Sequence, residues 1–261
     1  MVSFLDNFSA GTRGAASAEY FLAAGYAVLF LSRQHSQFPF TRCYSHTTNP
    51  FFDVLEETTN GDKGICVKAD EVNRLLPILH AYQEAKNSER LLTVPFVTVV
   101  EYLFLLRNIS LTLVPLKAHA LIYLAAAVSD FFLPLDKLSE HKIQSRDGAL
   151  SLELEQVPKV LHTLVHDWAP NAYVVTFKLE TDETLILPKA ERSLQNNGHQ
   201  LVIGNLLQKR KHEVVFVERA DSGAKHTLLR VTDDGREIEQ DIVARLAQLQ
   251  DAWIAHHAAT E

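Results

Sequence analysis

Hydrophobic positions along the chain follow two different spacings. Short apolar or β-branched runs predict buried strands, at residues 26–32, 120–131, 172–180 and 200–205, with two late strands at 212–218 and 226–232. Longer amphipathic stretches predict helices, at residues 9–25, 69–89, 97–110, within 181–197 and at 236–257. This alternation predicts an α/β fold: a three-layer Rossmann-like sandwich with a mainly parallel central sheet, plus a late β-hairpin region. We expect one domain over residues 1–261.

Local signals refine these elements. Ser9 or Thr12 is the expected N-cap of the first helix, and Gly25 is its expected end. The stretch from Arg33 to Lys68 contains Pro, Asn and Gly and is expected to be the least regular part of the chain. Pro188 leaves the start of the fourth predicted helix, within residues 181–197, open.

Composition and charge limit the class of protein. Of the 261 residues, 47% are hydrophobic and 22% charged, as in an ordinary globular protein. The net charge of −7 argues against general nucleic-acid binding but leaves discrete anion sites possible. The basic cluster at Gln208–Glu213 is expected to be a solvated turn.

Cysteine usage and hydropathy bear on the compartment. Cys43 and Cys66 are far apart and predict neither a disulfide framework nor a zinc site, which favours a reducing cytoplasmic compartment, with the nucleus also possible. Continuous apolar runs fall short of the roughly 20 residues that span a bilayer, and no signal-peptide pattern is seen, so we expect no membrane partner.

Three segments carry candidate chemistry. Gly11 and Gly14 open a helix and would let an anion approach the backbone, or would serve only tight helix–sheet packing. Leu124–Phe131 ends a strand in three alanines followed by Asp130, which would meet a hydroxyl or metal, or cap a helix. Phe177 would stack on a nucleotide base, or would only be a core Phe. Asn205, at the end of the next strand, would hydrogen-bond to the polar edge of such a base, or would only be a turn Asn.

Several enzyme classes lack their motifs in this sequence. There is no GxSxG for a serine hydrolase and no GxxxxGK[ST] for a P-loop NTPase. A nicotinamide-dependent reductase would need GxGxxG with a matched acidic residue, and that is absent as well. The twelve histidines are scattered, so no metal centre is predicted.

Together, in order and spacing, these segments resemble the eukaryotic phosphopantothenate–cysteine ligases of coenzyme A biosynthesis. The matching stretches are FLDNFSAGTRGA, FLAAGYAVLFL, YLAAAVSDFFLP, EHKIQS, VPKVL, DWAP, FKLETD and HQLVIGN. The resemblance implies an ATP-dependent ligation in the cytoplasm. The carboxylate of 4'-phosphopantothenate would attack the α-phosphate of ATP, and the amine of cysteine would displace AMP from the acyl-adenylate.

The resemblance also implies residue roles. Asn7 matches an Asn that contacts pantothenate and the activated acyl group, and Lys142 matches a lysine of a mobile strap facing the phosphates. The substrate loop is matched by Ala126, Ala127 and Asp130. The nucleotide site is matched by Ser9, Gly11, Gly14, Phe177 and Asn205. Mg²⁺ is expected on the triphosphate, and the family implies a homodimer, for which Glu213–Val231 is the candidate interface.

The sequence departs from the family pattern in two places. The bacterial branch has several lysines in the strap, and further lysines in the segment that corresponds to RSLQNNGHQ read its CTP. Apart from Lys142 these lysines are absent here, which fits an ATP-using enzyme. The family's strand and SGGT turn would precede FLDN, where the sequence begins with Met1–Ser3. A truncated, non-catalytic paralogue acting as a binding or dimer subunit is therefore the alternative to an active ligase.

Overall fold

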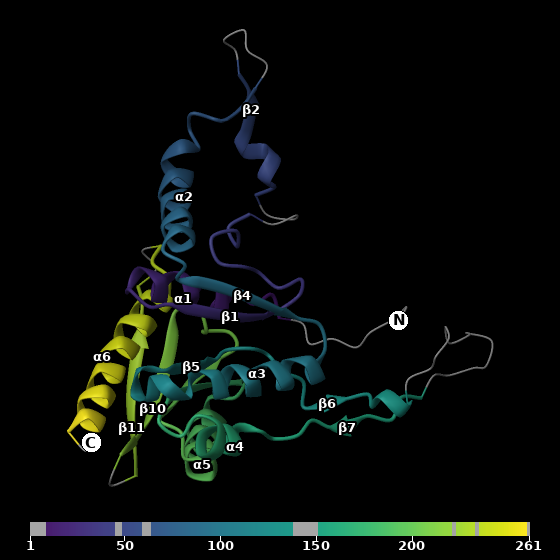
Figure 1. Ribbon diagram of the computed structural model, residues 1–261, viewed down its shortest axis with the longest axis vertical. Coiled ribbons are helices and arrows are strands. Elements are labelled where there is room, and N and C mark those ends of the chain that lie inside the picture. Colours follow the sequence, from purple (N-terminus) through teal and green to yellow (C-terminus); the bar gives the residue numbers. More distant parts are fainter. Residues whose placement is uncertain are drawn as a thin grey trace. The chain divides into compact units, whose positions relative to one another are not determined.

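The computed structural model describes residues 9–44, 49–58, 64–137, 151–220, 223–232 and 235–259 (Figure 1). The chain divides into two compact units. Unit 1 comprises Met1–Ser9, Phe96–Leu206 and Val215–Thr227. Unit 2 comprises Ala10–Pro95, Leu207–Val214 and Leu228–Glu261. The expectation of a single domain over the whole chain stays a prediction.

Unit 1 is organised by a five-stranded sheet with the order β11-β10-β9-β8-β5. Its strands are β5 (Leu121–Leu124), β8 (Tyr173–Glu180), β9 (Leu201–Leu206), β10 (Glu213–Ala220) and β11 (Gly223–Arg230). β8 runs parallel to both β5 and β9, and β10 returns antiparallel to β9. The parallel centre and the late adjacent strands confirm the predicted fold class.

The central strands are buried because their sequences are almost continuously apolar. All six residues of β9 are buried, and so are the first four of β8, which is the pattern of strands covered on both faces. Figure 1 shows α5 running close to this sheet, and Ala190 and Leu194 of that helix pack with Val202 of β9 and Val217 of β10.

The other elements of unit 1 precede these strands or connect them along the chain. They are α3 (Val99–Leu113), η2 (Val114–His119), β6 (Phe131–Phe132), η3 (Leu135–Lys137), β7 (Glu155–Gln156), α4 (Leu161–Thr163), a π-helical turn (Leu164–Trp168) and α5 (Glu183–Asn197). The α5 helix begins before Pro188 because the carboxylate of Asp182 caps the Thr184 N–H at 2.9 Å. It ends at Gly198, whose φ of 74° is left-handed.

Unit 2 combines helices with short strands. Its elements are α1 (Thr12–Ala23), β1 (Val28–Arg33), η1 (Phe51–Val54), β2 (Leu55–Glu57), β3 (Ile65–Val67), α2 (Val72–Asn87), β4 (Leu91–Phe96) and α6 (Ile238–Ala258). β1 pairs with β4, β2 pairs with β3, and α1 packs on α6. The α6 helix confirms the predicted closing helix, with Ile238, Ile242 and Leu246 fully buried.

Two features of unit 2 differ from the sequence expectation. The N-cap of α1 is Gly11, in a left-handed conformation without a side-chain cap, and neither Ser9 nor Thr12 takes that role. The strand β4 was not predicted, because Pro95 interrupts an otherwise strand-like run. The stretch 33–68 contains the short elements η1, β2 and β3, of three or four residues each, which agrees with the expectation that it is the least regular part of the chain.

One helical stretch differs from the hydropathy expectation. Val99–His119 is long and apolar enough to cross a membrane by length and composition alone, although its charged residues interrupt any continuous apolar run. A single helix of this kind is weak evidence for a membrane protein. The absence of a membrane partner stays a prediction.

A buried arginine joins three segments of unit 2. The Arg42 guanidinium donates to both carboxylate oxygens of Glu19 in α1, at 2.9 and 3.0 Å. It also donates to both oxygens of Glu237, the residue before α6, at 2.6 Å each. Burial alone would raise the pKa of Glu237, but the hydrogen bonds and charge of Arg42, with a hydrogen bond from Tyr20, lower it. The network therefore requires an ionised Glu237.

We expect Arg42→Met to destabilise the protein by about 2–3 kcal/mol, somewhat less than for a fully buried pair because Glu237 is 38% exposed. Since the folded pKa of Glu237 is depressed, its stabilisation is present above the unfolded pKa and is lost as pH falls through the folded value. Urea unfolding at pH 7 and at pH 4 measures both effects. A variant as stable as wild type at pH 7 would contradict the assignment.

Candidate functional site

The carboxyl ends of β5, β8 and β9 bring together the candidate residues of unit 1. β5 ends at Leu124, which pairs with Thr176 of β8. Phe177 pairs with Ile203, and Asn205 lies opposite Leu179. Because parallel strands end at one edge of a sheet, the loops after these strands share the position where open α/β sheets bind ligands.

The loop after β5 is open to solvent. Ala126 and Ala127 are exposed, as is Asp130, so the small side chains leave space at the strand end. Asp130 caps no helix: its backbone carbonyl accepts a hydrogen bond from the N–H of Val157 at 2.9 Å. Its carboxylate is therefore held at a short turn, next to β6, on the predicted substrate loop.

Phe177 and Asn205 differ in burial and in their contacts. Phe177 is half-buried and meets Tyr123 of β5 edge to face, with ring centroids 5.0 Å apart. Asn205 is only 5% exposed, and its amide donates to the carbonyl of Lys178 at 3.0 Å. That bond joins the ends of β8 and β9, so the Asn205 amide nitrogen is committed to the protein.

An ion cluster that was not predicted lies next to Phe177. Glu180 is held between Lys189 of α5, at 2.8 Å, and Lys178 of β8, at 3.8 Å, and its side chain is only 11% exposed. The signal was present in FKLETD as charges alternating after the Phe. A strand alone cannot reveal Lys189, which reaches Glu180 from the following helix.

A buried histidine just before β9 contacts β8. His199 is completely buried, and its Nε2 lies 2.9 Å from the hydroxyl of Thr176. Burial lowers the pKa of His199 to about 4, so the imidazole is neutral near pH 7. The pair is a structural polar contact between β8 and the residue that leads into β9.

The glycines of the opening turn lie in unit 2. Gly11 has a φ of 78°, and a Cβ there would come 2.9 Å from the Cβ of Ser36, so both conformation and space require glycine. Gly14 has room for a Cβ, which would lie 3.9 Å from the ring of Phe30. The N–H of Gln37 donates to the Ala10 carbonyl at 2.8 Å and fixes the turn.

Some candidates are not placed by these observations. Asn7 and Lys142 lie outside the described residues, and Ser9 is exposed in unit 1, at its boundary with unit 2. The described candidates therefore form two separate groups, one at the strand ends in unit 1 and one in the turn before α1 in unit 2.

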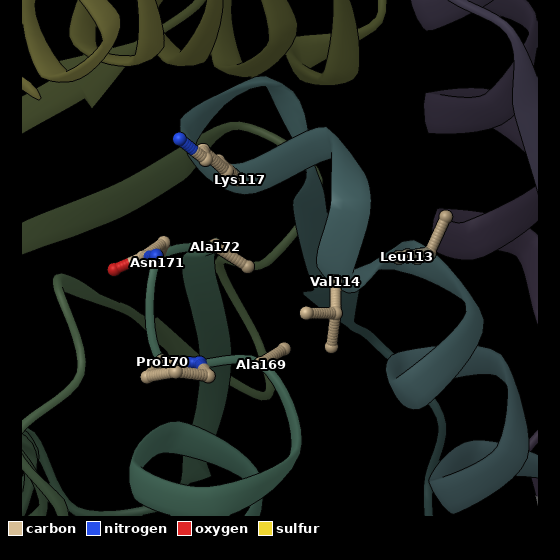
Figure 2. A pocket seen from close by; sticks show the side chains of 7 residues that line it. All are labelled: Leu113, Val114, Lys117, Ala169, Pro170, Asn171 and Ala172. Atoms are coloured by element: carbon tan, nitrogen blue, oxygen red, sulfur yellow. The ribbon is translucent and has the colours of Figure 1, made fainter. Parts of the chain in front are cut away.

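A small cavity lies at the other end of the sheet. Its lining residues come from the end of α3, from η2 and from the loop before β8: Leu113, Val114, Lys117, Ala169, Pro170, Asn171 and Ala172. Figure 2 shows Val114 and Ala169 lining this space, whose volume of about 10 Å³ suits at most one water molecule. Because it lies where β8 begins, it is no substrate site.

The structure also bears on metals and thiols. Within the part of the chain that the structure describes, no three His, Cys, Asp or Glu side chains are grouped to hold a metal. The histidines are not all scattered, contrary to the sequence expectation. His162 and His166 are four residues apart, and their ring centroids lie 4.2 Å from each other. Cys43 and Cys66 are both free thiols, as expected.

Comparison with known proteins agrees with this arrangement. Residues 109–250 match the family model described as DNA/pantothenate metabolism flavoprotein C-terminal domain. The chain is 42% identical over 257 residues to phosphopantothenate–cysteine ligase of Homo sapiens, covering 97% of this chain and 82% of that protein. It is also 42% identical to phosphopantothenate–cysteine ligase CAB2 of Saccharomyces cerevisiae, covering 98% of this chain and 73% of that protein.

A solved structure extends the similarity to three dimensions. The structure of a Cab2 H337A mutant in complex with phosphopantothenate-cysteine matches with a TM-score of 0.88 and 42% identity, covering 99% of this chain and 83% of that one. Identity at this level over nearly the whole chain, on the same fold, establishes the relationship. The chain belongs to the phosphopantothenate–cysteine ligase family.

Proposed function

We propose that this protein joins cysteine to 4'-phosphopantothenate in an ATP-dependent ligation that passes through an acyl-adenylate. The observation that carries the proposal is 42% identity, across 99% of the chain, to a ligase whose structure holds phosphopantothenate-cysteine. The exposed loop and aromatic residue at the carboxyl ends of β5 and β8 give further support. Neither a nicotinamide-dependent reductase nor a non-catalytic subunit has a comparable observation in its favour.

The chemistry requires activation of a carboxylate. In the first step an oxygen of the phosphopantothenate carboxylate bonds to the α-phosphorus of ATP, and pyrophosphate leaves. In the second step the cysteine amine bonds to the acyl carbon, AMP leaves with the bonding electron pair, and the amine loses a proton. The protein must align the two reactants, spread the phosphate charge and keep water from the mixed anhydride.

Residues of unit 1 suit the pantothenate chain of the substrate and the adenine base of ATP. The exposed Ala126 and Ala127 leave room for the pantothenate chain, and Asp130 offers a carboxylate to its polar groups. Phe177 supplies an aromatic surface on which adenine would stack, supported by Tyr123. Asn205 holds the strand ends together through its amide nitrogen, and we assign its contact with the nucleotide to the remaining amide oxygen.

The opening turn before α1 and the strap segment EHKIQS are proposed to bind the charged phosphate groups. Ser9, Gly11 and Gly14 are proposed to line the nucleotide site, and Lys142 to neutralise phosphate charge. Asn7 is proposed to donate its amide N–H to the oxygen that becomes negative at the acyl group. Mg²⁺ would enter with ATP, held mostly by phosphate oxygens and water.

We also propose a homodimer, in the cytoplasm or the nucleus, and no nucleic-acid or membrane partner. β11 is at one end of the strand order, and its residues are mostly exposed, including Leu228 at 49%. An exposed edge strand is a ready surface for a second copy, which favours this part of the predicted interface, Glu213–Val231. The two free thiols agree with a reducing compartment.

A coupled pyrophosphate assay tests the proposed activity. We expect pyrophosphate release only when ATP, 4'-phosphopantothenate and Mg²⁺ are all present, and AMP release only after cysteine is added. CTP in place of ATP should give slower release, since the lysines associated with CTP are absent. A chain that binds ATP but releases no pyrophosphate under any of these conditions would support the non-catalytic alternative instead.

Asn7→Asp should slow ligation by about 10²–10³-fold, because a donor to the developing oxyanion is replaced by an acceptor with a negative charge. Initial rates at saturating substrates measure the effect. Asn87→Asp makes the same chemical change at an exposed position at the end of α2 and should leave the rate unchanged. Wild-type turnover by the Asn7 variant would remove this residue from the mechanism.

Leu228→Lys should shift the protein from dimer to monomer, because it places a charge on the proposed apolar contact. Sedimentation equilibrium at several protein concentrations measures the mass. Leu185→Lys, on α5 and 41% exposed, is the matched control and should remain dimeric. If both variants keep the wild-type mass, the interface lies elsewhere on the chain.

A further inference from the structure

The basic cluster at Gln208–Glu213 is attached to the opening turn of α1 within unit 2. The guanidinium of Arg13, in the first turn of α1, donates a hydrogen bond from Nη2 to the backbone carbonyl of Arg210. Its Nη1 lies 3.1 Å from a carboxylate oxygen of Glu239, in the first turn of α6. One planar group in α1 therefore contacts two other segments, the nearer of which lies 197 residues away in sequence.

Both ends of this contact are shielded from solvent. The side chains of Arg13 and Glu239 are 16% and 13% exposed. Burial raises the pKa of Glu239, and the charge of Arg13 opposes that shift. A guanidinium has donors in a fixed fork, so it can serve a carbonyl and a carboxylate together, whereas a lysine has a single nitrogen.

The loop Gln208–Glu213 was expected to be a solvated turn, but its contact with Arg13 attaches it to α1. Lys209, Arg210 and Lys211 are all exposed, and the backbone turn closes through bonds from the N–H groups of His212 and Glu213 to the Lys209 carbonyl, both 2.9 Å. A cavity of about 250 Å³ lies on the loop, lined by Gln208, Lys209, His212, Glu213, Arg230 and Val231. Among these residues Arg230 donates to the carboxylate of Glu213 at 2.5 Å. The exposed cations of the loop itself, Lys209, Arg210 and Lys211, are the groups that suit a polyphosphate.

We propose that Arg13 is a positioning residue that holds this basic loop to the nucleotide-binding turn, so that both face the triphosphate in one fixed arrangement. The inference rests on the proposed function, because it takes the α1 turn as part of the nucleotide site. Arg13 itself does not touch the nucleotide. Because Arg13 already restricts the loop in the free protein, the loop cations lose less conformational entropy when ATP binds.

The test compares two arginines that make the same kinds of contact at opposite ends of α1. Arg90 donates to the carbonyl of Leu22, in the last turn of α1, at 2.9 Å, and to Glu84 at 2.6 Å. The double variants R13M/E239Q and R90M/E84Q each remove one such arginine together with its carboxylate. Neither leaves a buried charge without its partner, so both should fold and unfold at similar temperatures.

Isothermal titration with MgATP should give a Kd about tenfold weaker for R13M/E239Q, the factor for one lost hydrogen bond of ordinary strength, and a wild-type Kd for R90M/E84Q. In the ligation assay the KM for ATP should rise with the Kd while kcat stays near the wild-type value. Arg13→Lys, which keeps the charge beside Glu239 but cannot serve both acceptors, should fall between wild type and R13M/E239Q.

The outcomes separate this inference from the proposed function. Equal ATP affinities for the two double variants, or a loss of kcat with no change in KM, would overturn the positioning role of Arg13. A wild-type protein that binds ATP but forms no product would overturn the ligase assignment, while the comparison of affinities would still decide the role of Arg13. A wild-type protein that does not bind ATP would overturn both.

Discussion

The parallel pairing of β8 with β5 on one side and β9 on the other is the constraint on which the candidate site depends. Parallel strands need crossover connections, and α5 supplies the one between β8 and β9. Because all three strands run the same way, their following loops meet at one edge of the sheet. The burial of all six residues of β9 and of the first four residues of β8 holds this register, since a slip of one residue would turn every side chain to the other face.

Unit 2 depends on a different kind of interaction. Arg42 and Arg13 are buried or nearly so, and each pairs with a glutamate at the start of α6 or immediately before it. An unpaired buried charge is costly, so each arginine strongly favours the one arrangement in which its partners are present. Apolar packing of α1 on α6 supplies the bulk of the contact, and the two arginines determine how the ends of the helices and the adjoining loops are aligned.

The chemistry of the family explains why both kinds of interaction are useful. Adenylation needs a substrate carboxylate placed accurately against a phosphate, and rigid strand ends provide accurate positions. It also needs positive groups near a highly charged triphosphate, and exposed loops carry such groups without burying them. A loop held by a buried arginine combines accessibility with a fixed position, which is why Arg13 stands out among the arginines of unit 2.

Much of the fold could be predicted from local patterns. The runs that became β8, β9 and α6 were identified because their spacing of apolar residues leaves little choice. β4 was missed because Pro95 obscures its pattern, and the N-cap of α1 was assigned to Ser9 or Thr12 because side-chain caps are commoner than a left-handed glycine. The nearby pair His162 and His166 was readable from spacing and was overlooked.

By itself the sequence determined the family, the α/β class and the identity of the candidate residues, because ordered motifs and hydrophobic spacing are local properties. Only the tertiary structure decided what several of those residues do. It committed the amide nitrogen of Asn205 to Lys178, placed Lys189 against Glu180, and joined Arg13 to Arg210 and Glu239. These contacts link residues far apart along the chain, or on different elements, so no local pattern records them and only the packed chain brings the partners within hydrogen-bonding distance.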